Sequence, residues 1–221
     1  AVFDGTHPEN GDVLTAEDPY LIQWTKKGAG VTDVILEYST DGGAQYSYVN
    51  PVNPYTVLNS GNYSWPAVVG TVLSYDCKMK VSDPNNSNAF DVGAGQFRIK
   101  GLLTIAIPNG GQSWGANSTH DITWTKKGNI STVAIDYSPN NGQAGSWQSI
   151  ITGVSALPLK WSWHIDPGIT LTTTGKIRIT SEGEPDVSTI TAGNFEIKGN
   201  LVLNTPTEAG VSLAVGNSYD I

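Results

Sequence analysis

The sequence is poor in cysteine and in charge. Cys77 is the only cysteine among 221 residues, so no disulfide can form within the chain. Charged residues make up 14% of the chain, against about a quarter in an average soluble protein. Basic residues number 12 against 20 acidic ones, for a net charge of −8. Because phosphate backbones are bound by clustered basic side chains, this balance argues against a nucleic-acid partner.

Long apolar runs and helical periodicity are also missing. No run approaches the roughly 18 apolar residues of a membrane-spanning helix, so no transmembrane segment is expected. The first residues do not have the pattern of a secretory leader, and we expect either that one was removed or that the chain is a piece of a longer one. These absences exclude a helical bundle and disfavour most enzyme classes.

What the sequence does contain is an internal repeat. The offset between matching residues falls only from 100 at Trp24 and Trp124 to 98 at Lys78 and Lys176. Four segments match in the same order: 23–28 with 123–128, 36–39 with 135–138, 78–81 with 176–179, and 94–101 with 192–199.

The repeat defines the predicted domains. We predict two complete repeats, residues 1–100 and 101–199, and a partial third over residues 200–221, where Pro206 falls on the position of Pro8 and Pro108. A lone hairpin is marginally stable in water. The tail therefore either begins a further repeat of a longer polypeptide or pairs with a neighbouring subunit as a donated strand.

Within each repeat, apolar residues alternate with polar ones. Val133, Ile135 and Tyr137 show this period of two, and so do Trp161 and Trp163. The pattern predicts strands with one buried face, separated by turn signals at 41–43, 83–86, 140–142 and 166–168. About seven such strands per repeat predict an all-β fold of tandem immunoglobulin-like β-sandwich domains.

Two further features refine this prediction. Trp24 and Trp124 occupy matching strand positions, and we expect each to fill the centre of a core. Residues 97–105 run from the first repeat into the second without a polar or glycine-serine linker. Such a junction predicts a stiff tandem.

One set of residues in the second repeat resembles a known module. It consists of Pro108, Asn109, Gly110, Gly111, Trp114, Gly115, Ile122, Trp124, Val133, Ile135, Tyr137, Ser138, Trp147 and Ile150. This set resembles the tandem immunoglobulin-like repeat of secreted surface proteins, and is similar to the amino-terminal domain of the Kre9/Knh1 yeast cell-wall proteins. The first repeat departs from it, with Asn10 for the first glycine and Leu14 for the first tryptophan. The resemblance implies an extracellular, non-catalytic structural module of the cell surface or cell wall.

No catalytic set is apparent, and we predict that the chain is not an enzyme. Residues 111–115 match the G-x-S-x-G pattern, but a nucleophile elbow needs a helix after the serine, and strand-like sequence follows here. His7, His120 and His164 have no partners at metal-ligand spacing. We therefore assign no catalytic residue and no metal ligand.

Calcium is the one cofactor that the sequence leaves open. The oxygen-rich segment 83–88 contains Asp83, and Asp91 is the next carboxylate. Calcium prefers clustered oxygen ligands. An ordinary turn stabilised by aspartate and asparagine side chains explains the same residues.

The sequence offers two roles for glycans, as bound ligands and as covalent modifications. Tyr48, Tyr55 and Tyr75 have no aromatic counterpart in the second repeat, so they are candidate stacking platforms for a sugar, unless the first repeat is simply rich in tyrosine. Four N-x-S/T sequons provide candidate glycosylation sites: Asn62, Asn85, Asn117 and Asn129.

The matching pairs at 26–27 and 126–127 concentrate lysine in one loop per repeat. We expect these lysines either to be solvated or to meet acidic patches on a neighbouring subunit.

Two functions remain. The first is a structural module of an extracellular surface protein, self-assembling with copies of itself into a surface layer, sheath or filament and carrying glycans. The alternative is a carbohydrate-binding or adhesive β-sandwich, whose partners would be surface glycans.

Overall fold

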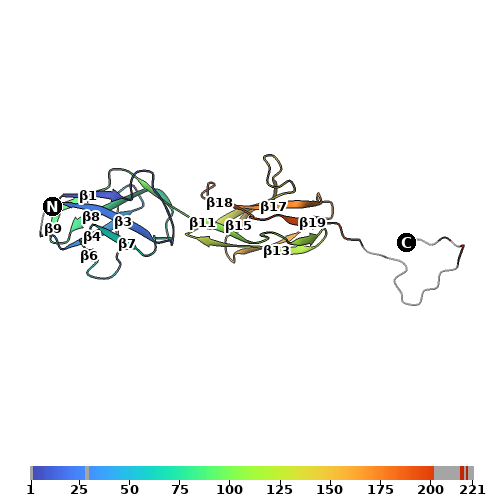
Figure 1. The fold of residues 1–221 in the computed structure, drawn as a ribbon, viewed down its shortest axis with the longest axis horizontal. Coiled ribbons are helices and arrows are strands. Elements are labelled where there is room, and N and C mark those ends of the chain that lie inside the picture. Colours follow the sequence, from blue (N-terminus) through green and yellow to red (C-terminus); the bar gives the residue numbers. More distant parts are fainter. Residues whose placement is uncertain (1, 28–29, 202–214, 217, 219–221) are drawn as a thin grey trace.

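The computed structural model describes residues 2–27, 30–201, 215–216 and 218. This part of the chain contains strands β1 to β19 and no α-helix, and therefore no helix that could cross a membrane. The strands form two sandwiches that lie end to end along the long axis (Figure 1).

Each sandwich has one small and one large sheet. In the first, β1 (Val2–His7), β3 (Tyr20–Lys27) and β7 (Asn62–Trp65) form the small sheet. The large sheet has the order β2 (Val13–Thr15), β10 (Phe97–Lys100), β8 (Ser74–Asp83), β4 (Asp33–Ser39) and β5 (Ser47–Tyr48); β6 (Thr56–Leu58) also pairs with β4, and β9 (Asn86–Val92) with β8.

The second sandwich has the same order. Its small sheet contains β11 (Leu102–Ile107), β13 (Thr119–Lys127) and β16 (Lys160–His164). Its large sheet runs β12 (Ser113–Gly115), β19 (Phe195–Lys198), β17 (Thr172–Ser181), β14 (Thr132–Ser138) and β15 (Gln148–Ser155), with β18 (Ser188–Ile190) on β17.

The register of the strands repeats as well. Trp24 lies opposite Gly5, Trp124 lies opposite Ile105, and both pairings are interrupted at the next step of the ladder. In both sandwiches the short second strand pairs in parallel with the last strand, β2 with β10 and β12 with β19. This strand order is that of an immunoglobulin-like sandwich and confirms the predicted all-β fold class.

The two matching tryptophans are buried, as predicted. Trp24 is 4% exposed and Trp124 is 2% exposed. The indole N–H of Trp24 donates to Asn59 Oδ1 at 2.8 Å, and that of Trp124 donates to the Ala156 carbonyl at 3.2 Å. Each indole is therefore packed in the core, and its N–H group has a hydrogen-bond acceptor, as a buried N–H group requires.

On each large sheet, a cationic side chain lies over an aromatic ring and also pairs with a carboxylate. Arg178 lies 4.4 Å from the Trp147 ring centre and pairs with Asp136 at 2.9 Å. In the first sandwich, Lys80 lies 5.2 Å from the Tyr46 ring centre and pairs with a glutamate, Glu37, at 2.8 Å. The matched aromatics thus hold the loop after β4 or β14 against the sheet.

The sandwiches differ at one edge. Segment 47–58 of the first sandwich is divided into β5 and β6, and its Val49 and Val57 are buried in the core. The second sandwich has the continuous strand β15 in this place. Alternation predicts a buried Trp161, yet only Trp163 of this strand is buried, and Trp161 is partly open to solvent. Alternation shows which side chains of a strand face inward, but it does not show whether the opposite sheet extends far enough to cover each of them.

We predict that Trp124→Ala lowers the free energy of unfolding of the second sandwich by about 3–5 kcal/mol, because the surrounding core cannot collapse into the space left by an indole. Urea denaturation followed by circular dichroism measures the change. Leu157→Ala, at a residue that is 60% exposed, is the control and should change stability by less than about 0.5 kcal/mol. A similarly small loss for Trp124→Ala would contradict the packing described here.

Candidate functional site

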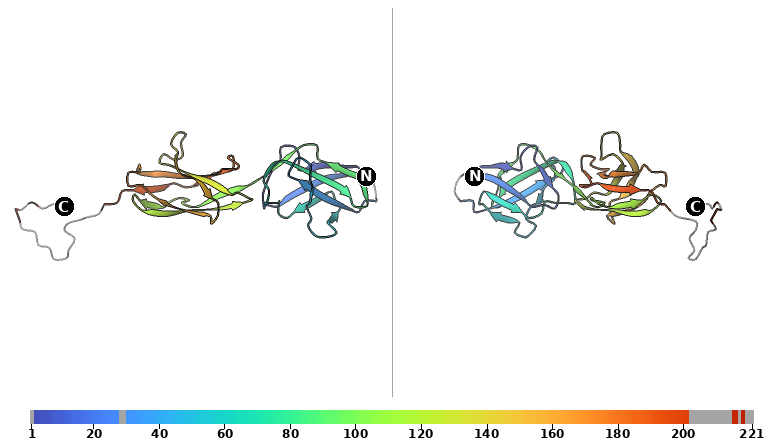
Figure 2. Two further views of the ribbon diagram at one scale, coloured as in Figure 1. Left: turned by 180° about the vertical axis from the view of Figure 1, so that it is seen from behind. Right: turned by 45° about the vertical axis from the view of Figure 1, so that its right-hand side comes forward.

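The feature that distinguishes this chain from two loosely joined sandwiches is the junction between them. Strand β10 continues through Gly101 into β11, with no linker between (Figure 2). Gly101 is buried, and a Cβ there would lie 2.8 Å from Ile130 Cδ1 and 3.1 Å from the Lys127 carbonyl oxygen. The junction therefore requires glycine at this position because the second sandwich approaches the backbone so closely.

A second glycine, which belongs to the second sandwich, lies against residues of the first sandwich. Gly128 has φ +79, and a Cβ there would lie 2.8 Å from Leu73 Cδ2 and 3.0 Å from Ala16 Cβ. Leu73 packs against the cores of both sandwiches. Apolar packing thus continues across the junction, which limits bending between the two bodies.

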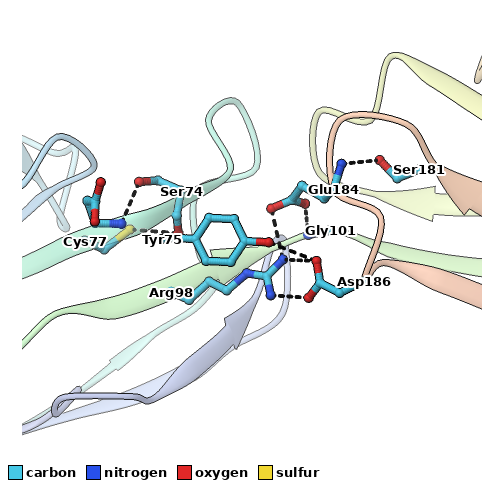
Figure 3. A network of polar contacts seen from close by, with 9 residues as sticks. Ser74, Tyr75, Cys77, Arg98, Gly101, Ser181, Glu184 and Asp186 are labelled. Atoms are coloured by element: carbon cyan, nitrogen blue, oxygen red, sulfur yellow. Dashed lines mark hydrogen bonds and ion pairs between the residues drawn. The ribbon is translucent and has the colours of Figure 1, made fainter.

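A polar cluster closes one side of the junction (Figure 3). Arg98, from β10, forms a two-point ion pair with Asp186, with one N–H···O distance of 3.0 Å, and contacts Glu184 at 3.2 Å. The Tyr75 hydroxyl donates to Asp186 at 2.9 Å, and the Arg98 guanidinium lies 4.0 Å from the Tyr75 ring centre. Glu184 is 7% exposed, and one of its oxygens accepts the Gly101 N–H at 3.4 Å.

The groups of this cluster change one another's pKa values. Hydrogen bonds from Arg98 lower the pKa of Asp186 from its ordinary 3.8 to about 2. The hydrogen bond to Asp186 raises the pKa of Tyr75 and, as the largest cause, that of Arg98. A planar guanidinium suits this place because it binds a carboxylate at two points and stacks on an aromatic ring at the same time.

Ionic contacts also close a second side. Lys127 forms an ion pair with Asp18, and the Gly128 N–H donates to Glu17 Oε1 at 2.9 Å. We expected these lysines either to be solvated or to meet acidic patches on a neighbouring subunit, and for Lys127 the preceding sandwich of the same chain supplies the acidic partner. Lys126 instead donates to the Ile130 carbonyl at 2.8 Å.

The repeat pattern does not predict the contacts of Arg98 at this junction. Glu196 stands in the second sandwich where Arg98 stands in the first, as the matching pairs Arg98–Val13 and Glu196–Ser113 of the parallel ladders show. Glu196 accepts a hydrogen bond from its own neighbour Ser113 at 2.8 Å. The junction cluster is therefore a property of this particular pair of sandwiches, and no periodic signal could have revealed it.

The three candidate stacking tyrosines are separated. Tyr75 lies in the junction cluster, with Arg98 over its ring. Tyr48 and Tyr55 stack on each other with ring centres 4.3 Å apart and planes at 9°. Tyr48 remains half-exposed. No continuous strip joins all three, although the Tyr48–Tyr55 pair lies at the surface of the first sandwich.

The calcium candidates lie on one hairpin. Asp83 ends β8, and its Oδ1 accepts the Asn85 N–H at 2.8 Å, as in a turn stabilised by an aspartate side chain. Asp91 lies in β9, opposite Val81. Within the described ranges, no three His, Cys, Asp or Glu side chains are grouped so as to hold a metal ion.

The candidate glycosylation sites are all exposed. Asn62 begins β7, and Asn85 lies in the β8–β9 turn. Asn117 has φ +59 in the turn between β12 and β13. Asn129 differs from these three because its amide nitrogen donates to the Thr71 carbonyl across the junction at 3.2 Å. A glycan at Asn129 would attach to the nitrogen that makes this contact.

The second sandwich also contains a groove that strand patterns do not indicate. It has a volume of about 540 Å³ and lies between the edge strands β15 and β16. Trp161 and His164 are among its lining residues. The signal for it is indirect: the first repeat has extra turn residues, around Pro51 and Pro54, in the segment that matches β15.

Comparison with solved structures finds other immunoglobulin-like and fibronectin III modules. The fibronectin(III)-like modules of Clostridium thermocellum CbhA share 12% identity over 90% of this chain and 95% of theirs, with a TM-score of 0.29. The four N-terminal Ig domains of Dscam1 share 13% identity over 90% of this chain and 47% of theirs, with a TM-score of 0.36. The FN1–FN3 domains of chicken CNTN1 share 12% identity over 83% of this chain and 62% of theirs, with a TM-score of 0.32.

No family model matches the chain, and no curated protein matches it in sequence. The chain has an immunoglobulin-like and fibronectin III type of fold, which its own strand order defines.

We predict that Arg98→Ala loosens the junction, because it leaves the buried Glu184 without its cationic partner, at a cost of roughly 1–3 kcal/mol. Small-angle X-ray scattering should show a broader distribution of distances between the two sandwiches, with both still folded. Lys160→Ala is the matched control, because it removes an ion pair to Asp121 far from the junction. Identical scattering from Arg98→Ala and wild type would show that apolar packing alone sets the geometry.

We also predict a pH dependence. Because the pKa of Asp186 is lower in the folded chain than its ordinary 3.8, its contribution is complete above about pH 4 and is lost as the pH falls through about 2. Wild type and Asp186→Asn should therefore differ in stability at about pH 5 and converge near pH 2. Thermal unfolding of both proteins across this range measures the effect. A constant difference would show that Asp186 does not titrate with the junction.

Proposed function

We propose that this chain is a non-catalytic structural module of an extracellular surface protein, which holds two sandwiches at a fixed spacing and assembles with copies of itself into a layer, sheath or filament. The observation that carries the proposal is the junction. It combines a glycine with no room for a side chain, apolar packing by Leu73 on both cores, and ion pairs on two sides.

A junction of this kind favours a mechanical role. Domain interfaces within a chain usually leave relative motion as the default unless they are extensive or firmly bonded. Here the connecting strand has no free length, so bending would break the contacts of Arg98 and Lys127 with the facing sandwich. In such a unit the orientation of one sandwich sets the orientation of the other, as an extended surface structure requires.

The surface composition agrees with this role. The four sequon asparagines are exposed, where glycans can be attached. The resemblance to secreted surface repeats supports placement at the cell surface or cell wall. The resemblance to the Kre9/Knh1 module supports a structural task, and no catalytic residues follow from it.

Lateral contacts between copies need an exposed apolar surface. The segment 47–58 of the first sandwich provides one, with Tyr48 and Tyr55 stacked and Val52 and Leu58 strongly exposed. Isolated exposed apolar residues are common, but several on one short segment are typical of an interaction surface. We therefore assign this segment as a contact between neighbouring copies.

Sedimentation velocity and negative-stain electron microscopy test the proposal. Wild type should form ordered assemblies as its concentration rises, and Leu58→Asp should reduce self-association at least tenfold, because a carboxylate would be desolvated in the contact. Leu157→Asp is the matched control, since Leu157 is 60% exposed, close to the 68% of Leu58, but lies on the other sandwich. Monomers at every concentration would refute self-assembly.

A further inference from the structure

The groove of the second sandwich is separate from the junction and from the proposed contact segment. It lies where the two sheets end on the same side, at β15 of the large sheet and β16 of the small one. Its volume of about 540 Å³ falls within the roughly 300–1,000 Å³ of small-ligand sites. In the first sandwich the matching segment is divided between β5 and β6, and its Val49 and Val57 enter the core.

Apolar and polar groups line the groove together. Ile150, Trp161 and Ile169 are partly buried side chains that pack against the core and also reach the groove. The polar lining consists of Gln148, Ser149, Ser162, His164 and Asp166. A ligand in this groove would therefore meet an aromatic and aliphatic surface on one side and hydrogen-bonding groups of both kinds around it.

Several of these polar groups are held in place. One Asp166 oxygen accepts the Gly168 N–H at 2.6 Å, and His164 Nδ1 lies 3.2 Å from the Thr119 hydroxyl. Ser162 and His164 alternate with Trp161 and Trp163 along β16, and Ser162 donates to Asp121 outside the groove, so the side chains of Ser162 and His164 lie on the outer face of the small sheet. Polar groups that are fixed before binding lose less conformational freedom when a ligand arrives.

The charge of the lining limits the class of ligand. The lining residues include the carboxylate of Asp166 and no lysine or arginine. Phosphate, sulfate and uronic acids are bound mainly by cationic side chains. An uncharged ligand with many hydroxyl groups and an apolar face satisfies both the polar groups and Trp161.

An extended peptide fits this groove less well. The ladder between β14 and β15 is interrupted after Val133 and again after Ile135. Bulges bend an edge strand and end its pairing, and natural sheets use them to prevent addition of a further strand. The edge that β15 offers to a peptide is therefore irregular.

We propose that this groove is a binding site for an uncharged oligosaccharide, with a sugar ring against Trp161 and its hydroxyls hydrogen-bonded to Gln148 and Asp166. The site goes beyond the proposed structural function. It uses none of the three tyrosines that the sequence nominates for sugar stacking, and it lies in the other sandwich.

Isothermal titration calorimetry of the full chain tests this site. The probes are hexamers of glucose, mannose and N-acetylglucosamine, with a hexamer of galacturonic acid as the anionic comparison and a six-residue extended peptide as the competing ligand. We expect at least one uncharged hexamer to bind and the anionic hexamer to bind at least tenfold more weakly. Trp161→Ala should reduce binding more than tenfold.

Two further variants keep the result interpretable. Gln148→Ala changes one exposed side chain of the groove only, so a weaker affinity in this variant cannot come from unfolding. Tyr63→Ala is the matched control, because Tyr63 lies opposite Ile22 as Trp161 lies opposite Ile122, and binding should be unchanged. The proposal is overturned if no uncharged hexamer binds, if the groove variants bind as wild type does, or if the peptide binds in place of the sugars.

Discussion

The geometry of the tandem depends on the contact that Arg98, at the end of the first sandwich, makes with Glu184 and Asp186 of the second. The guanidinium is positioned by strand β10 and by the Tyr75 ring, so its direction is set before the second sandwich is reached. Burial of Glu184 makes its cationic partner necessary, since removing that partner costs roughly 1–3 kcal/mol. Gly101 and Gly128 allow the two bodies to approach closely enough for the contact to form.

The two sandwiches share a scaffold but differ in how their edges are used. Their strand order, the position of the central tryptophan and the interruption after it are the same in both. At one edge the first sandwich divides the strand into β5 and β6 and buries Val49 and Val57, whereas the second has the continuous strand β15 and a groove beside Trp161. A duplicated core can carry different surfaces because packing constrains only the inward face of each strand.

A stiff pair of sandwiches and a groove on one of them are compatible properties. The contacts at the junction favour a constant orientation of the groove relative to the first sandwich, which the proposed assembly of many copies would require. The apolar segment around Leu58 and the groove around Trp161 belong to different sandwiches. The proposed contacts between copies and the proposed binding of an oligosaccharide can therefore be tested with separate variants, because distant sites contribute nearly independently.

The sequence by itself determined the fold class, the duplication and the two buried tryptophans. These follow from local rules: period-two alternation marks the buried face of a strand, and turn residues mark its ends. Only the tertiary structure decided that Tyr75 belongs to the junction, that Trp161 borders a groove and that Lys127 meets Asp18. The partners of these residues lie far away in the sequence, as with Arg98 and Asp186, 88 residues apart. Alternation reports which side of a strand is buried, but it carries no information on where another sheet ends or which surface of the next sandwich faces it.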